Sequence, residues 1–351
     1  MSLDENKLME FMGKVVGDLG AAAAATLVIL GDRLGLYKAM ADGAGHLPAE
    51  LAAKTKTNER YVREWLDAQA AGGYVIYDAA RKTYALPPEQ AFALAEEMGP
   101  ASAAGAFHVI QAMYAAIPKM EGNFRTGGGI EWGDQHPCLF EGTERFFRAS
   151  YIGNLIGSWI PALEGVKSKL EKGARVADVG CGLGASAILM AKAFPRSKFF
   201  GFDLHAHSIE TARRRAAEAG VTNATFDVAG AGDYPGTDYD LVAHFDCLHD
   251  MVDPIGAARQ VRRTVAKDGT WLIVEPLAGD RPEENHNGVG RLYYAASTML
   301  CVPNSLAHQG VALGAQAGER RLRQVAVEGG GFTRFRRATE TPFNLIFEAR
   351  P

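Results

Sequence analysis

The residues with the clearest chemical meaning lie in one short stretch, residues 176–186, where an acid precedes three glycines. The order is Val-Ala-Asp178-Val-Gly180-Cys-Gly182-Leu-Gly184-Ala-Ser. The valines favour a buried strand, and glycines let a backbone approach a ligand with no Cβ in the way. The residues that follow have helical composition, so the free N–H groups of a helix start face the same loop. The stretch therefore predicts a site for a nucleotide-type cofactor.

A second acid follows at the spacing expected for such a site. Residues 198–203 are Lys-Phe-Phe-Gly-Phe-Asp, an apolar strand that ends in Asp203. In α/β nucleotide-binding folds, a carboxylate placed there accepts hydrogen bonds from the ribose hydroxyls. Taken alone, Gly180, Gly182 and Ala185 also fit the dinucleotide fingerprint, so the glycines do not identify the cofactor.

Asp178 separates the two alternatives. Dinucleotide enzymes normally carry an apolar residue two positions before the first glycine, whereas an acid followed by Gly-Cys-Gly-x-Gly resembles motif I of the class I S-adenosylmethionine (SAM) methyltransferases. Over about residues 171–351 the rest of that family's pattern follows in order, with Asp203, a fourth strand at 239–245 and a turn and fifth strand at 267–275. The resemblance implies an α/β fold, a Rossmann-like seven-stranded domain that closes with an antiparallel hairpin.

The resemblance also implies which residues hold SAM and its product S-adenosylhomocysteine (SAH). They are Asp178, Gly180, Gly182, Gly184, Asp203, Leu204, Ala231 and Phe245. The chain departs from the family after the third strand, where the usual acid that binds the adenine amino group is replaced by Gly230. We therefore expect adenine recognition to rest on backbone groups or on Asp233.

A candidate base follows the fourth strand. Residues 246–254 resemble the Leu-His-Asp segment of the winged-helix O-methyltransferases, whose histidine is the general base, and this match implies that role for His249. Histidine suits the role because its pKa lies near working pH. Glu275, at the end of the fifth strand, matches the family's flanking glutamate, so Glu275 or Asp250 is expected to hold the tautomer. The alternative is that His249 only packs or caps a helix start.

Composition excludes several other classes of protein. A net charge of −4 over 351 residues implies no polyanionic partner. The four cysteines have no C-x-x-C spacing, which argues against a disulfide framework and a zinc site and favours a reducing, cytoplasmic compartment. Asp203-x-His205-x-His207 coincides with the ribose strand, and Glu275-Pro276 stands where magnesium-dependent enzymes carry Asp-Asn, so we expect no metal. The apolar segment from Gly20 to Gly31 is too short for a bilayer, so no membrane is expected.

The first 98 residues predict a separate helical domain. A helix over 47–54, a second over 59–71 and two strands at 74–78 and 83–86 resemble a winged helix. The arginines of the second helix are outweighed by acids, which argues against nucleic acid as a partner. In the O-methyltransferases that the chain resembles, this module serves dimerisation, so we expect a homodimer through the N-terminal helices. Residues 15–40 are apolar nearly all round, which suits a subunit interface or the chain's own core.

Two further segments are expected to build the pocket for the methyl acceptor. Residues 99–170 predict a helical linker and lid with a glycine-rich loop that carries Trp132 and His136, and about residues 277–317 predict a lid insertion with Tyr293 and Met299. Long connections in a compact domain are usually functional. The domains expected are thus 1–98, 99–170 and 171–351. The alternative for each of the large side chains named here is core packing.

Together these features favour an enzyme that transfers a methyl group from SAM to a small aromatic or hydrophobic hydroxyl compound. Two alternatives remain from the sequence. One is a SAM-binding transcriptional regulator that uses the winged helix on DNA, and the other is an NAD-dependent oxidoreductase.

Overall fold

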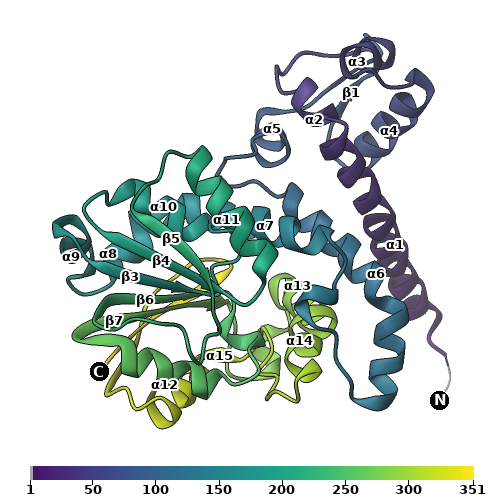
Figure 1. Cartoon of the computed structure of the whole chain (residues 1–351). Helices are drawn as coiled ribbons and strands as arrows, with labels where there is room; N and C mark the ends of the chain where they lie inside the picture. Colours follow the sequence, from purple (N-terminus) through teal and green to yellow (C-terminus); the bar gives the residue numbers. More distant parts are fainter. Residues whose placement is uncertain (1–2) are drawn as a thin grey trace. The chain divides into compact units, whose positions relative to one another are not determined.

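A computed structural model describes residues 3–351, which fold as two compact units (Figure 1). Unit 1 contains the chain up to Gln111 together with Glu141–Ala149, and unit 2 contains Ala112–Phe140 and Ser150–Pro351. The segment 99–170, which the sequence analysis set apart as a linker and lid, is divided between the two units. Its helices therefore belong to the bodies on either side.

Unit 1 has the predicted helices and hairpin. Asn58 accepts a hydrogen bond from the Arg60 N–H and so caps α4, and the two short strands pair antiparallel. Trp65 of α4 packs edge to face on Tyr37 and anchors the core of this unit. The elements are α1 (Glu5–Arg33), α2 (Leu36–Ala39), α3 (Pro48–Thr55), α4 (Glu59–Ala71), β1 (Ile76–Asp78), β2 (Thr83–Ala85), α5 (Pro88–Leu94) and the first part of α6 (Ala104–Thr126).

Helix α1 is longer than the apolar segment expected from the sequence. It has 29 residues, and by length and composition alone it could cross a membrane, so the length argument made from residues 20–31 is wrong. Near its end, Val28 belongs to the core of unit 1, and the carbonyl of Leu27 accepts a hydrogen bond from the Trp65 indole at 2.8 Å. Only 22% of its most apolar window is buried. Farther toward its start, Leu8, Met12, Val16 and Leu19 are exposed.

Unit 2 is built on a seven-stranded sheet in the order β5-β4-β3-β6-β7-β9-β8. The first five strands in this order pair in parallel, and β9 runs antiparallel to both β7 and β8. The strands are β3 (Arg175–Val179), β4 (Lys198–Asp203), β5 (Ala224–Val228), β6 (Tyr239–Phe245), β7 (Val265–Pro276), β8 (Arg334–Glu340) and β9 (Asn344–Arg350). The edge strands expose charges, with Asp227 on β5 and Arg334 on β8. This is the predicted sheet, and its parallel strands bring their carboxyl ends to one edge.

Helices connect and flank these strands. Those along the parallel strands are α10 (Ala185–Ala193), α11 (Ala206–Glu218) and α12 (Pro254–Thr264). Before the sheet come the end of α6, η1 (Trp132–Asp134), α7 (Cys138–Asn154, shared with unit 1), η2 (Leu155–Trp159), α8 (Ile160–Ala162) and α9 (Val166–Lys172). Around the insertion after β7 lie η3 (Leu248–Asp250), η4 (Pro282–Asn285), α13 (Gly288–Ala296), η5 (Ser297–Cys301), α14 (Val302–Ala307), α15 (Gly318–Arg323) and η6 (Gln324–Gly329).

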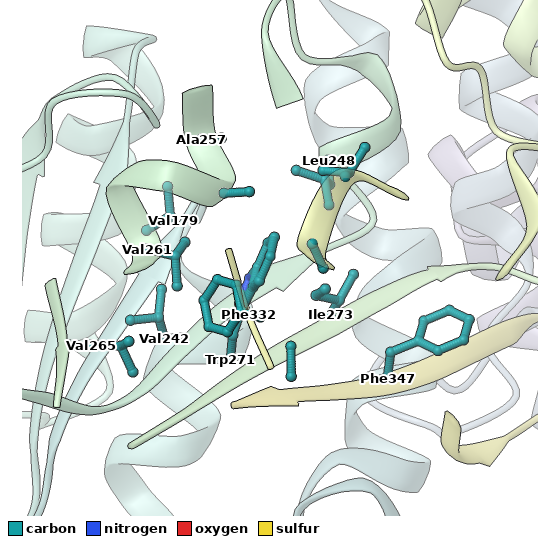
Figure 2. Packing of buried hydrophobic residues seen from close by; sticks show 14 of the residues in the cluster. Val179, Val242, Leu248, Ala257, Val261, Val265, Trp271, Ile273, Phe332 and Phe347 are labelled. Atoms are coloured by element: carbon teal, nitrogen blue, oxygen red, sulfur yellow. The ribbon is translucent and has the colours of Figure 1, made fainter. Parts of the chain in front are cut away.

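The core of unit 2 is centred on Trp271 of β7 (Figure 2). Its ring packs against Phe332 at 5.1 Å between centroids, and its indole N–H donates to Nδ1 of His244 at 2.9 Å. Burial without a charged partner lowers the pKa of His244 to about 3. This histidine is therefore a neutral core residue.

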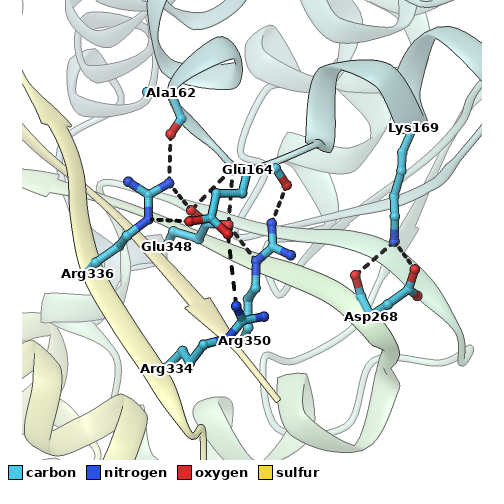
Figure 3. Close-up of polar contacts among 8 residues, drawn as sticks. All are labelled: Ala162, Glu164, Lys169, Asp268, Arg334, Arg336, Glu348 and Arg350. Atoms are coloured by element: carbon cyan, nitrogen blue, oxygen red, sulfur yellow. Dashed lines mark hydrogen bonds and ion pairs between the residues drawn. The ribbon is translucent and has the colours of Figure 1, made fainter.

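A polar cluster ties the closing hairpin to the segment that precedes β3 (Figure 3). Glu348 is 2% exposed, pairs with the Arg336 guanidinium, and accepts from Arg350 Nε at 2.6 Å. The Glu164 N–H also points at this carboxylate, at 3.3 Å. The buried charge is thus compensated from two strands and a loop.

Candidate functional site

The glycine turn after β3 has the geometry of a backbone cradle. All three glycines have positive φ, 75° at Gly180, 51° at Gly182 and 82° at Gly184, which L side chains rarely adopt. A Cβ at Gly180 would lie 2.7 Å from Cys247 Sγ, whereas one at Gly182 would meet nothing within 4 Å. Gly182 thus borders open space, as a loop that receives a ligand requires.

Asp178 lies under this turn and is 1% exposed. Its Oδ2 accepts from the Ser186 hydroxyl at 2.5 Å, and its Oδ1 has no hydrogen-bond partner. Burial, followed by the negative charge of Asp203, raises the pKa of Asp178 to about 7. A buried acid with an unsatisfied oxygen is costly unless a ligand completes its hydrogen bonds.

Asp203 ends β4 at the same edge. Its Oδ2 accepts from the Gly182 N–H at 2.9 Å, so the acid also fixes the glycine turn, and burial raises its pKa. Leu204 beside it is 77% exposed, and Ala231 is half-buried at the end of β5. Asp233 is exposed, and its Oδ1 accepts from the Gly230 N–H at 3.0 Å, so part of that carboxylate is used to shape its own loop.

His249, shortly after β6, meets Glu275 near the end of β7. His249 Nδ1 lies 2.5 Å from Glu275 Oε2, and the two side chains are 3% and 2% exposed. Glu275 Oε1 accepts from the Leu248 N–H at 3.0 Å, so one carboxylate positions both the loop and the ring. Burial lowers the pKa of His249, but the charge and hydrogen bond of Glu275 and contact with Cys301 outweigh it, so the pKa lies well above its ordinary value. The pair has the arrangement of an imidazole base held by an acid.

The other residues of this loop are also close to the pair. Burial raises the pKa of Asp250 to about 7, and the negative charge of Glu275 adds to the effect. The Cys301 thiol, on the π-helical turn η5, lies close enough to His249 to contribute to its raised pKa. The backbone carbonyl of Asp250 accepts from Asn304 Nδ2 at 3.1 Å, which joins the loop to α14.

Several acids gather in the site. Cys247 is surrounded by carboxylates, four of which raise the pKa of its thiol after burial itself: Asp250, Glu275, Asp178 and Asp246. Asp203 also acts on Asp178 and Asp250. Among residues 3–351 no group of three or more His, Cys, Asp or Glu side chains is placed to hold a metal ion. A cationic ligand would stabilise the ionised forms of these acids, whereas an anionic ligand would not.

The predicted acceptor residues separate into two groups. Tyr293 is buried, donates to the Phe343 carbonyl at 2.9 Å, and feels the charge of Asp246, so it borders the site. Trp132 packs on Phe140, which stacks on His205 at 4.6 Å, two residues past Asp203. His136 accepts from the Cys138 N–H and stabilises its own loop.

Met299 belongs to the second group. It packs against a hydrophobic cluster of Ala116, Met120 and Ile130, beside the helix α6. Its partly buried side chain thus contributes to core packing, and its place in the acceptor pocket stays a prediction.

Three residues of the site were missed from the sequence. Asp246 follows β6 directly, and its carboxylate accepts from Asn344 Nδ2 at 2.7 Å and from the Tyr151 hydroxyl at 3.4 Å. A carboxylate directly after an apolar strand is a sequence pattern from which Asp246 could have been predicted as a site residue. Tyr151 and Asn344 give no such signal, because they lie 95 and 98 residues from it along the chain.

Family models match two parts of the chain. Residues 22–96 match the Rv2258c-like winged HTH domain, and residues 170–314 match a methyltransferase domain. Residues 170–314 are a methyltransferase domain. The predicted winged-helix domain, α/β fold and methyltransferase class of enzyme are thereby confirmed.

The methyltransferase domain is similar in sequence to curated proteins, and each match covers only part of the other protein. An uncharacterized methyltransferase of Bacillus subtilis, YcgJ, is 30% identical over 122 residues, which are 34% of this chain and 47% of that protein. The 27-O-demethylrifamycin SV methyltransferase of Amycolatopsis mediterranei is 30% identical over 156 residues, 42% of this chain and 52% of that protein. The chain thus spans about half the length of these relatives.

Solved structures share the fold of the whole chain. Human N-acetylserotonin methyltransferase in complex with SAM has a TM-score of 0.73 and 16% identity, and the match covers 100% of this chain and 99% of that one. The mitomycin 7-O-methyltransferase MmcR has a TM-score of 0.73 and 18% identity, over 99% and 100% of the two chains. The methyltransferase domain and the winged HTH domain therefore occur together in known structures of this architecture.

Proposed function

We propose that this protein transfers the methyl group of SAM to a hydroxyl of a small aromatic or hydrophobic acceptor, with His249 as the general base. The observation that carries the proposal is the buried His249–Glu275 pair, 2.5 Å apart, beside the glycine turn of a methyltransferase domain. A structure of the same fold contains SAM, and another is an O-methyltransferase by name.

The residues present fit that cofactor. Gly182 borders open space, Asp203 ends β4 beside the turn and can accept from ribose hydroxyls, and Oδ1 of Asp178 has no hydrogen-bond partner. Bound SAM supplies a methyl group on a positively charged sulfur, and the acids Asp178 and Asp250 near Cys247 can complement that charge. Glu275 holds the His249 ring by Nδ1, which leaves the other ring nitrogen as the one to take the acceptor's proton.

The site's charge counts against an NAD-dependent oxidoreductase. NAD carries an anionic pyrophosphate, and the acids around Cys247 do not complement that charge. The winged helix likewise offers little charge for DNA, since Arg60 pairs with Glu64 and Arg63 with Glu59 on α4 itself, each at 2.5 Å.

The partners we propose are the small-molecule acceptor and a second copy of the chain. The exposed apolar stripe Leu8, Met12, Val16 and Leu19 on α1 suits a homodimer in a cytoplasmic protein. We propose no nucleic acid, membrane or metal as a partner.

The test of the proposed function is incubation of the protein with methyl-labelled SAM and a cell extract, followed by identification of the labelled compound. Parallel titrations with SAM, NAD and a DNA pool distinguish the three alternatives. The expected result is SAM binding and one labelled small hydroxyl compound. Tight NAD or DNA binding without SAM binding would overturn the proposal.

A further inference from the structure

The carboxylate of Asp246 is near the His249–Glu275 pair, and its hydrogen bonds go to Asn344 and Tyr151 and not to the base. The residue has a φ of 51°, a left-handed conformation that is uncommon outside glycine. Such backbone strain is concentrated at functional sites, where surrounding contacts fix it. The Asp246 N–H still donates to the Val274 carbonyl at 2.8 Å, so the strained residue is anchored to β7.

Neighbouring residues hold this carboxylate in place. Asn344, 1% exposed, gives its amide N–H to Oδ1 at 2.7 Å and accepts from Ser150 through its own oxygen at 3.2 Å. The Tyr151 ring packs on Phe245 at 5.3 Å, which fixes its hydroxyl beside Oδ2. In the β7–β9 ladder Asn344 is opposite Pro276, one position beyond Glu275, so the acid lies next to the His249–Glu275 pair.

The carboxylate has capacity for one more partner. At 3.4 Å the Tyr151 bond to Oδ2 is much longer than the usual O–H···O distance, so Oδ2 is the less satisfied oxygen. Burial and the negative charge of Glu275 raise the pKa of Asp246 well above its ordinary value. The ionised form therefore needs a further hydrogen-bond donor, and Asp246 is half-buried, so a ligand in the site can reach it.

We propose that Asp246 binds a second hydrogen-bond donor of the acceptor, a hydroxyl or amine adjacent to the hydroxyl that is methylated. This assignment rests on the proposed function and names its substrate class, a vicinal dihydroxy or amino-hydroxy aromatic compound. Tyr151 and Asn344 are positioning residues for Asp246. Selectivity arises because an analogue without the second donor leaves Oδ2 without a strong hydrogen bond.

The experiment measures the binding of four probes to the full chain saturated with SAH, by calorimetry. Catechol and ortho-aminophenol carry the second donor, ortho-methoxyphenol carries an oxygen without a donor, and phenol carries neither. We expect the first two to bind about 10- to 100-fold more tightly than the last two, the range for a hydrogen bond to a charged group. A gain for catechol or for ortho-aminophenol alone supports the assignment and names the donor.

Asp246→Asn is the decisive variant, because asparagine keeps the shape and tolerates a positive φ. It should abolish the affinity gap, that is, the difference in affinity between the two probes with a second donor and the two without, and leave SAM affinity within about twofold. Tyr151→Phe should narrow the same gap. Asp268→Asn, which removes an exposed carboxylate paired with Lys169, is the matched control and should keep the gap.

The assignment is overturned if the wild type binds all four probes with equal affinity or binds none of them. It is also overturned if Asp246→Asn keeps the affinity gap. Loss of SAM affinity in Asp246→Asn would overturn it as well, because Asp246 would then belong to the cofactor site. Methyl transfer from labelled SAM is measured separately. Absence of SAM binding defeats the proposed function, whereas SAM-dependent transfer without the affinity gap defeats only the role of Asp246.

Discussion

Replacing Glu275 by glutamine tests how the base works. The substitution keeps an acceptor for the Leu248 N–H and removes the negative charge 2.5 Å from His249. The neutral imidazole takes the acceptor's proton, and Glu275 holds the His249 pKa above its ordinary value. The wild-type rate should therefore rise as pH increases through that raised pKa. In Glu275→Gln burial acts on His249 without the opposing charge, so the rising limb should move to lower pH.

The magnitude follows from the burial of the pair. With both side chains at most 3% exposed, the hydrogen bond between charged groups that forms in the transition state contributes about 1.5–3 kcal/mol. Its loss in Glu275→Gln should lower the plateau rate by about 10- to 100-fold. His249→Ala should lose about 10²–10⁴-fold at neutral pH, the usual contribution of a general base. That variant should recover near pH 10 as a phenolic acceptor ionises by itself.

The assay measures the rate of SAH release from about pH 5 to about pH 10, with the acceptor that the labelling experiment identifies. SAM affinity is measured in parallel. Asp268→Asn serves as the control for loss of a carboxylate. The reasoning is refuted if His249→Ala turns over at the wild-type rate at neutral pH, which would leave proximity alone as the mechanism. It is also refuted if the rising limb of Glu275→Gln stays in place.

Three further predictions follow from other features. Asp203→Ala should weaken SAM binding, measured by calorimetry, by about 10- to 100-fold because it removes a charged hydrogen-bond acceptor for the ribose. Unchanged SAM affinity in a variant whose circular dichroism shows an intact fold would exclude Asp203 from the cofactor site. Light scattering should give a mass of twice 37.6 kDa, and Met12→Glu with Val16→Glu should return it to 37.6 kDa; a wild-type monomer at micromolar concentration would contradict the dimer. Glu348→Ala should lower the free energy of unfolding by about 3 kcal/mol because it removes the carboxylate that pairs with Arg336 and with the mostly buried Arg350. In urea titration the exposed-site variant Asp268→Ala should lose less than about 1 kcal/mol of unfolding free energy. Equal losses for Glu348→Ala and Asp268→Ala would show that burial does not set the contribution of Glu348.

The parts of the site that were predicted from sequence share a property. The glycine turn is contiguous. Asp203 and Glu275 lie at the ends of apolar strands and His249 shortly after one, and parallel pairing brings these strand ends to one edge of the sheet. Local pattern and sheet topology together therefore place them. The fold class and the winged helix were predictable for the same reason.

The remaining features depend on packing that a local pattern does not encode. Met299 lies on a helical stripe, and the sequence does not say which face of that stripe meets the core. Tyr151 and Asn344 reach Asp246 only through the tertiary fold. Helix α1 extends well before the apolar run at residues 20–31, because the polar residues before it also favour a helix, with Asp4 as its cap.

The two edge strands of the sheet have a consequence for how the protein behaves at high concentration. Unpaired strand edges can add strands from other molecules and so start aggregation. On β5, the exposed Asp227 pairs with Arg213, and on β8 the ladder is irregular between Arg337 and Thr339. Another chain that paired with either edge would have to accommodate these charges or this irregular register. Pairing of strands between molecules is thereby disfavoured at both edges of the sheet.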